Sequence, residues 1–497
     1  MSDARANSYL SFSTDVGLVA GVEVGKLLLV FVRLPLLTKL LGAEHYGTLS
    51  LVLVTAALLA PAAALGLGAA VVRFLAAENT ATRVRDRFFS ATAVVLLAGA
   101  ALCLAVILTA DFLESTVYGG VDASAVIRLG AFLIVTEALN RMTQCYFRAF
   151  RRMGWFATMN VALPVLELAL MAGFLALGWG LRGVIIGMLI AGVVTAVTSL
   201  SVVAVQVGVS VPRFAGMGRY LRYGIPLIPS RPLNWVINYS DRYMLGYFLG
   251  AAQVGLYSAA YGITNVISVL ATPVGMVLFP TVARLYDQGK TEETKTYFRY
   301  SIKYVLMLSI PAAVGLSVLS VPLIRLFTSE EFVDGAAIVP LVAGGLVAAG
   351  LRQLLDYIFH LVNKTFWVML LLGIAAVLNV LLNLLLIPPY GIMGAAIATT
   401  AAFVVVATVT GVVGFRYLRI DMSPRFLAKS VVASAAMGAA IWAVSPSGLL
   451  AVAASIILGA IGYFAVLFLL RGFSRTEIAF LRSLLASLVP ARLRRAP

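Results

Sequence analysis

Charged side chains are scarce in this chain, and acidic ones are the scarcest. Only 12% of the 497 residues are charged, about half of what a soluble domain carries, whereas 61% are hydrophobic. Apolar stretches of roughly 20 residues, the length that crosses a hydrocarbon core about 30 Å thick, recur along the chain. The composition therefore excludes a soluble globular protein and predicts an all-α polytopic membrane protein.

Cysteine is also nearly absent. The two cysteines, Cys103 and Cys145, both fall inside apolar stretches, so we expect neither a disulfide framework nor a metal site, and no cofactor. The polar N-terminal stretch MSDARANSYLSFSTD lacks the order of regions found in a cleavable signal, and we expect the first apolar stretch to remain as a membrane span.

The apolar stretches predict about fourteen transmembrane helices. We place them at 16–41, 47–72, 89–110, 124–146, 154–177, 183–206, 224–248, 254–281, 303–326, 336–361, 366–387, 392–415, 430–445 and 449–470. With the N-terminus inside, the inward segments hold 25 Lys and Arg residues and the outward loops hold only Arg182. This asymmetry predicts that both termini are cytoplasmic in a multi-pass protein of the cytoplasmic (inner or plasma) membrane.

The net charge of +16 has the same explanation. Basic residues gather in the inward segments because of the positive-inside rule, so we expect no nucleic-acid partner. The outward loops are short, and two of the longest are acidic. They leave no outward domain for extracellular chemistry, and we expect a protein that is not an enzyme.

An internal repeat divides the chain. The pattern LGAxxxG occurs at 41–47 and again 208 residues later at 249–255, and GLRG at 180–183 matches GIMG at 391–394. Repeats of six spans that start on the same side form parallel lobes around an axis along the membrane normal. We expect an N-lobe over 1–206, a cytoplasmic linker over 207–223, a C-lobe over 224–418, two extra helices over 419–471 and a basic amphipathic tail over 472–497.

Polar residues within the spans form stripes, which face protein or a cavity because charge at mid-bilayer depth is costly. The first span carries Glu23, Lys26 and Arg33, the fourth Glu137 and Arg141, the seventh Arg231, Asn234, Asn238, Asp241 and Arg242, and the tenth Arg352 and Asp356. Neighbours such as Glu137 and Arg141 can pair along their own helix. Self-paired scaffolding and direct ligand contact both remain open for these groups.

Arg33 and Arg231 differ, because neither has an acidic residue within one turn of its own helix. The spans together hold eleven basic residues against five acidic ones. An arginine fork suits a phosphate group. We therefore predict a cationic cavity between the lobes that binds an anion.

Three blocks carry a resemblance: LPLLTKLLGAEHYG, IPLIPSRPLNWVINYSDRYMLGYFLGAAQVGLYSAAY and NVLLNLLLIPPYGIMGAAIAT. They are similar to blocks of the oligosaccharide (polysaccharide) flippases of the Wzx type, and the resemblance runs from about residue 10 to 470. The superfamily also contains the multidrug and toxin extruders and the lipid II flippases. The resemblance implies a MATE-like fold of two six-helix lobes plus two C-terminal helices, and export of a polyprenyl-linked oligosaccharide from the inner to the outer leaflet.

Alternatives within this fold are a multidrug antiporter and a flippase for lipid II or a teichoic acid precursor. The expected partners are a lipid-linked oligosaccharide, membrane lipids and other polysaccharide-assembly proteins. The candidate cavity residues are Arg33, Arg231, Lys26, Arg141, Arg242, Arg352, Asn234 and Asn238, with Glu23, Asp241 and Asp356 as candidates for Na⁺ or H⁺ coupling or for lobe pairing. We expect Arg33 and Arg231 to face each other across the lobe interface and hold the lipid pyrophosphate.

Overall fold

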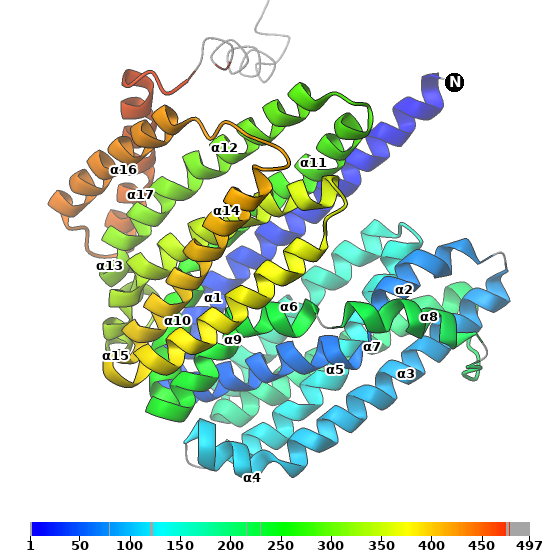
Figure 1. Cartoon of the computed structure of the whole chain (residues 1–497). Coiled ribbons are helices and arrows are strands. Elements are labelled where there is room, and N and C mark those ends of the chain that lie inside the picture. Colours follow the sequence, from blue (N-terminus) through cyan, green and yellow to red (C-terminus); the bar gives the residue numbers. More distant parts are fainter. Residues whose placement is uncertain are drawn as a thin grey trace, which may run out of the picture.

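The computed structural model describes residues 2–78, 80–119, 123–214, 216–228, 230–473 and 477, without the side chains of 2–20, 23, 24, 27, 227, 230 and 231. The described chain is helical throughout, and it contains no strand (Figure 1).

The first lobe consists of α1 (Ser2–Ala63), α2 (Leu67–Phe74), η1 (Leu75–Ala77), α3 (Ala81–Leu108), α4 (Ala110–Leu113), η2 (Glu114–Tyr118), α5 (Ala123–Ala149), α6 (Met153–Ala176) and α7 (Gly180–Val207).

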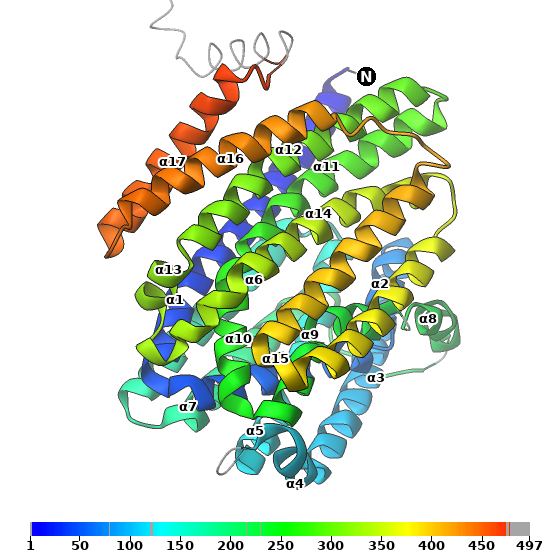
Figure 2. The same cartoon turned by 60° about the vertical axis from the view of Figure 1, so that its left-hand side comes forward.

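The second lobe follows a connector formed by α8 (Met217–Gly224) and η3 (Ile225–Leu227). It consists of α9 (Ser230–Leu249), α10 (Ala251–Thr264), α11 (Val266–Asp287), α12 (Thr291–Val318), α13 (Ser320–Phe327), η4 (Glu330–Ile338), α14 (Val339–Leu361) and α15 (Phe366–Gly414). Two further helices, α16 (Pro424–Val444) and α17 (Leu449–Leu469), complete the described chain and pack beside α12 (Figure 2). We call the two groups the N-lobe and the C-lobe.

Eleven described helices are long and apolar enough to cross a membrane. Two of them contain a sharp turn at a glycine with positive φ, α1 at Gly42 and α15 at Gly391, so each supplies two spans. The polar stripe of α9 keeps that 20-residue helix out of the eleven, and with it the total is fourteen. The prediction of a multi-pass all-α membrane protein with this fold class is confirmed.

The repeat is visible in the backbone. Gly42 (φ 76°, ψ 173°) and Gly250 (φ 82°, ψ 173°), which are equivalent in the LGAxxxG pattern, adopt the same conformation. At Gly42 the first half of α1 turns into the second, and at Gly250 α9 turns into α10. We call the end of the molecule that carries these two glycines the glycine end, and the opposite end, which carries the α2 and α8 segments, the basic end.

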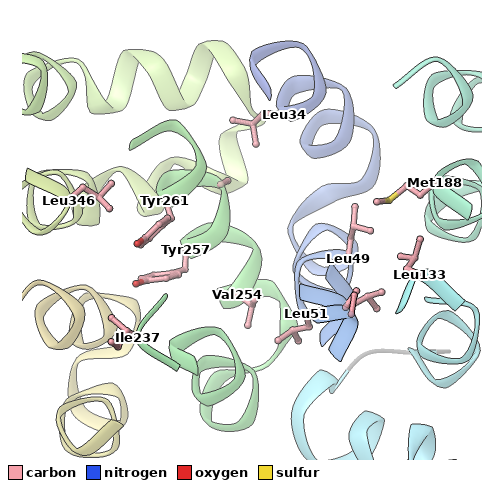
Figure 3. Packing of buried hydrophobic residues seen from close by; sticks show 14 of the residues in the cluster. Leu34, Leu49, Leu51, Leu133, Met188, Ile237, Val254, Tyr257, Tyr261 and Leu346 are labelled. Atoms are coloured by element: carbon pink, nitrogen blue, oxygen red, sulfur yellow. The ribbon is translucent and has the colours of Figure 1, made fainter. Parts of the chain in front are cut away.

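Helix α1 lies between the two lobes. In Figure 3, Leu49 and Leu51 of α1 are flanked on one side by Leu133 and Met188 of the N-lobe and on the other by Val254 of α10. Because one continuous apolar cluster includes residues from both lobes, α1 couples the packing of the two halves.

The connector between the lobes is fastened to the N-lobe. The Ser210 hydroxyl donates to Asp86 Oδ1 (2.6 Å), and the backbone N–H of Arg213 donates to Ser90 Oγ (2.8 Å). Tyr220 of α8 is buried and packs edge-on against Phe74. The connector up to α8 is therefore bound to the N-lobe by hydrogen bonds and aromatic packing.

A buried ion pair joins the C-lobe to the segment that follows α17. Lys303 Nζ of α12 lies 2.7 Å from both carboxylate oxygens of Glu477, and both side chains are at most one-tenth exposed. Lys303 also lies over the ring of Phe426, at the start of α16. Glu477 therefore neutralises a cation where α12 and α16 meet, whereas the amphipathic tail predicted beyond it lies outside the described residues.

Replacing Glu477 by Gln should lower the melting temperature of the detergent-purified protein markedly, because breaking a buried ion pair costs about 3–5 kcal/mol. The matched control is Glu292→Gln, which removes the partner of Lys295 in an exposed pair with the same N–O distance (2.7 Å). Truncation after Glu477 should spare the fold, whereas truncation before Glu477 should not. Equal melting temperatures for the two Gln variants would contradict a structural role for Glu477.

Candidate functional site

A cavity of about 730 Å³ lies between the lobes. Both halves of α1 form one wall, and α9, α10, α11, α14 and α15 form the others. Among the described residues that line it, three are arginines and none is acidic. The sequence prediction of a cationic cavity between the lobes therefore has a structural counterpart.

Each of the three arginines, Arg33, Arg242 and Arg352, has its carboxylate behind it rather than in the cavity. Arg352 Nη1 lies 2.6 Å from Asp356 Oδ2, one turn further along α14. Arg33 Nη1 lies 3.6 Å from Glu167 Oε2 of α6, within the N-lobe. The guanidinium groups thus face the cavity with their counter-charges turned away from it.

Arg242 is the most enclosed of the three. Its guanidinium lies 4.7 Å from the ring centre of Tyr261, 5.2 Å from that of Tyr239 and 5.6 Å from that of Tyr257. It donates to the backbone oxygen of Asn238 (2.7 Å) and to Asp241 Oδ1 (3.3 Å). Aromatic faces and a carboxylate together fix the orientation of this cation at the cavity wall.

Neutral polar groups surround the arginines. The cavity is lined by the amides Asn234, Asn238, Asn265 and Gln353, by the hydroxyls of Ser50, Ser258 and Ser268, and by Tyr46, Tyr239 and Tyr261. Asn234 and Asn238 belong to the predicted site, whereas Asn265, Gln353, Tyr46 and Tyr239 were not predicted. Tyr239 and Gln353 directly follow the predicted residues Asn238 and Arg352, which is a signal in the sequence that could have found them, whereas Tyr46 and Asn265 have no predicted residue within two turns.

A second cavity, of about 500 Å³, lies within the N-lobe. Lys26, Arg141 and Glu137 line it, and Arg33 belongs to both cavities. Arg141 Nη2 donates to Glu137 Oε1 (2.8 Å), and Lys26 donates to Asn160 Oδ1 (3.2 Å). The predicted helical pairs Glu137–Arg141 and Arg352–Asp356 are thus present, whereas the side chain of Glu23 lies outside the described residues.

The structure changes one premise of the prediction for Arg33, whose role in binding an anion stays a prediction. The sequence argument left its counter-charge to a bound ligand, but Glu167 supplies one from α6. Nor are Arg33 and Arg231 equivalent in the repeat, because an offset of 208 residues pairs Arg33 with Asp241 and Glu23 with Arg231. The side chain of Arg231 itself lies outside the described residues.

Depth along the helices gives a better partner for Arg33. Arg33 precedes Gly42 by nine residues, and Arg242 precedes Gly250 by eight. Arg231 precedes Gly250 by 19 residues, which places its backbone about 15 Å deeper than that of Arg33 at 1.5 Å per residue. Arg33 and Arg242, which both line the cavity, therefore lie at the same depth on opposite lobes.

Asp241 belongs to a buried polar cluster inside the C-lobe. Its Oδ2 accepts hydrogen bonds from the Tyr257 hydroxyl (2.6 Å) and the Thr399 hydroxyl (3.3 Å). Asn379 donates to Thr399 Oγ1 (3.2 Å), and Asn383 donates to Asn379 Oδ1 (3.0 Å). The Oδ1 atom of Asn383 is buried, and the described structure gives it no hydrogen-bond donor. The cluster joins α9, α10 and α15, and its five side chains carry carboxylate, amide and hydroxyl oxygen atoms that could act as ligands.

Solved structures share this architecture. A structure described as "Lipid II flippase MurJ, inward closed conformation" is 15% identical, covers 93% of this chain and 99% of its own, and gives a TM-score of 0.76. An inward-facing MATE family transporter of the MOP superfamily is 16% identical, covers 79% and 94%, and gives a TM-score of 0.69. At these identities the likeness establishes the fold alone.

Sequence comparison is more specific. The model of the polysaccharide biosynthesis protein family matches residues 13–286, and the MatE model matches residues 226–385. The chain belongs to the polysaccharide biosynthesis protein family. The "Probable low-salt glycan biosynthesis flippase Agl15" of Haloferax volcanii is 24% identical over 302 residues, 60% of this chain and 63% of the relative. The match thus spans less than two thirds of that relative.

Proposed function

We propose that this protein is a flippase that moves a polyprenyl-(pyro)phosphate-linked oligosaccharide across the membrane for the assembly of a surface polysaccharide or glycan. The observation that carries the proposal is the inter-lobe cavity, whose described lining has three arginines and no carboxylate. A diphosphate is anionic and matches the planar, multiply donating guanidinium. The protein acts as a transporter and not as an enzyme.

The arrangement of the cavity supports a division of labour. Arg33 of the N-lobe and Arg242 of the C-lobe, at equal depth, would hold the diphosphate from both sides. The amides and exposed tyrosine faces, Tyr239 above all, would contact sugar hydroxyls and ring faces. An anion bound by both lobes is the feature that a rotation of the lobes can carry from one membrane face to the other.

Two other substrates fit the same fold. Lipid II and teichoic acid precursors carry the same phosphate chemistry with other sugars, and the cavity suits them equally. A multidrug antiporter for cationic compounds would need carboxylates in the cavity wall, and the described lining has none. The charge of the cavity therefore favours an anionic lipid-linked glycan over a cationic drug.

The basic end is the cytoplasmic one in this proposal, in the inner or plasma membrane, with both termini inside. The support is that the segments predicted to face inward hold 25 Lys and Arg residues, whereas the loops predicted to face outward hold one. A reporter enzyme that is active only outside the cell, fused after residue 497, should stay inactive; external activity would reverse the orientation and the direction of export.

We further propose that a cation gradient drives the transport and that Na⁺ binds at the Asp241 cluster. Carboxylate, amide and hydroxyl oxygens are the ligands that hard cations prefer. The buried Asn383 Oδ1, for which the described structure has no hydrogen-bond donor, supports such a site. Proton coupling through Asp241 or Asp356 is the competing outcome.

Depletion of the protein tests the proposed function in cells. The lipid-linked oligosaccharide should accumulate on the cytoplasmic leaflet, protected from glycosidases added outside the cell, while its synthesis continues. Mass spectrometry of extracted lipids measures the amount, and glycosidase protection measures the leaflet. Depleted cells that keep a normal level and leaflet distribution of this lipid would contradict the proposal.

A further inference from the structure

The glycine end of the cavity is closed where α1 and α10 cross. The crossing is formed by Gly47 and Gly255, the last residues of the two LGAxxxG patterns. A Cβ on Gly47 would overlap the backbone oxygen of Ala251 and lie 2.8 Å from the nitrogen of Gly255, and a Cβ on Gly255 would overlap the oxygen of Ala43. The two helices therefore touch backbone to backbone, which no other residue type allows.

One turn further into the molecule, the two lobes are joined by a hydrogen bond between equivalent residues. Ser50 Oγ lies 2.7 Å from Ser258 Oγ, and these serines are 208 residues apart, the spacing of the repeat. Both line the cavity, and the next turns of the same helices, with Leu53 and Tyr261, diverge to form its walls. The serine pair thus lies in the cavity wall and on the pseudo-two-fold axis.

Two flanking contacts repeat the same symmetry. The Thr38 hydroxyl donates to the backbone oxygen of Phe327 at the end of α13 (3.2 Å). Its equivalent 208 residues later, Gly246, packs against the backbone oxygen of Val117 in η2, where an added Cβ would lie at 2.5 Å. In each lobe, the first helix therefore contacts a backbone carbonyl of a short helix in the other lobe: α1 contacts α13, and α9 contacts η2.

From this symmetric, backbone-to-backbone closure we infer that Gly47, Gly255, Ser50 and Ser258 form the gate of the glycine end, and that the lobes part there when the cavity turns to the other membrane face. The inference rests on the proposed alternating access but not on the identity of the substrate. The crossing consists of weak Cα–H···O contacts and one neutral hydrogen bond, and the described crossing contains no ion pair. Such a closure is specific in shape yet easily broken.

The glycines are tested by side-chain addition. In a chain with Cys103 and Cys145 replaced by Ala, a reporter cysteine is placed at Leu53, which lines the cavity one turn after Ser50. A membrane-impermeant thiol reagent is then added at the glycine end. Relative to the protein with Gly255 intact, Gly255→Ala should raise the labelling rate of this cysteine about tenfold or more, because it destabilises the closed state. The matched control is Gly262→Ala on the same helix, where an added Cβ meets nothing within 4 Å.

The serines are tested by cross-linking. In the same cysteine-free chain without the reporter, the S50C/S258C pair should form a disulfide with a mild oxidant such as copper phenanthroline, because the native oxygens are already in contact. Transport of the glycan lipid in reconstituted vesicles should then fall to the level of empty vesicles and return on reduction. In each of the two single-cysteine variants, the oxidant should leave the transport rate at the value measured for that variant before oxidation.

Equal labelling of the Gly255→Ala and Gly262→Ala proteins would overturn the inference, as would undiminished transport by the cross-linked protein. Should Gly255→Ala fail to accumulate, the cysteine pair decides alone. If the protein that has not been cross-linked carries no glycan lipid, the proposed function fails, while labelling of the Leu53 reporter in the Gly255→Ala and Gly262→Ala proteins still tests the gate.

Discussion

Replacing Arg33 by Gln is expected to reduce transport of a diphosphate-linked oligosaccharide about a hundredfold, the loss that corresponds to one charge-assisted, forked contact worth up to about 3 kcal/mol. Arg33 lies in the wall shared by the two cavities, at the same depth as Arg242 on the opposite lobe. The measurement is the initial rate of transport in vesicles that contain equal amounts of folded protein.

A loss of activity in this variant alone has two explanations, because Arg33 also pairs with Glu167. The double variant R33Q/E167Q separates them, since it removes both charges and leaves no uncompensated carboxylate at position 167. We expect the double variant to be as inactive as the single one if Arg33 binds the anion. Recovery in the double variant would show that Arg33 only balances Glu167. Arg33→Lys should recover part of the activity, because it keeps the charge but not the fork.

Removal of Na⁺ at constant pH is expected to lower transport about tenfold or more in the unmodified protein, and the variant Asn383→Leu should lose this dependence. Asn383 presents a buried oxygen beside the Asp241 cluster. The comparison variant is Thr410→Val on the same helix, which also removes a buried polar atom that has no partner in the described structure. Transport that responds to pH and not to Na⁺ in the unmodified protein would instead assign the coupling to protons.

Most of the architecture could be predicted from the sequence. Apolar run lengths gave the spans, and the LGAxxxG echo located the two glycines that turn α1 and lead α9 into α10, because only a residue without a Cβ adopts that backbone conformation readily. The same repeated pattern contains Gly47 and Gly255. A repeat in the sequence shows that two residues are equivalent, but it does not predict that they are in contact. The contact follows from the two-fold axis passing between them.

The site was predicted less well, for a physical reason. Pairing rules based on helix periodicity find partners on the same helix, such as Arg352 and Asp356, and these were predicted. Glu167, the partner of Arg33, lies on another helix of the same lobe, and the packing of α1 on α6 is invisible to periodicity. Asp241 was expected to couple an ion or to pair the lobes. Its described partners Tyr257, Thr399 and Arg242 all lie in the C-lobe and so do not pair the lobes, whereas ion coupling stays a prediction.

The matching of Arg33 with Arg231 stays a prediction, because the side chain of Arg231 lies outside the described residues, but the sequence spacing argues against it. Both arginines lie on equivalent helices, but the repeat spacing pairs Arg33 with Asp241, and the two positions differ by about 15 Å in depth. Arg242, one residue beyond Asp241, points into the cavity because the neighbouring tyrosines and Asp241 fix its side chain. Depth along a span has to be counted from a shared landmark, here Gly42 and Gly250.

The most direct test of the cationic cavity compares two lipids in vesicles that contain the purified protein. One is a polyprenyl diphosphate-linked oligosaccharide, and the other carries the same oligosaccharide on the same polyprenyl chain through an uncharged linkage. We predict rapid protein-dependent transport of the first, at least about a hundredfold faster than that of the second, and loss of this difference in R33Q/E167Q. Equal transport of the two lipids by the unmodified protein would contradict recognition of the diphosphate.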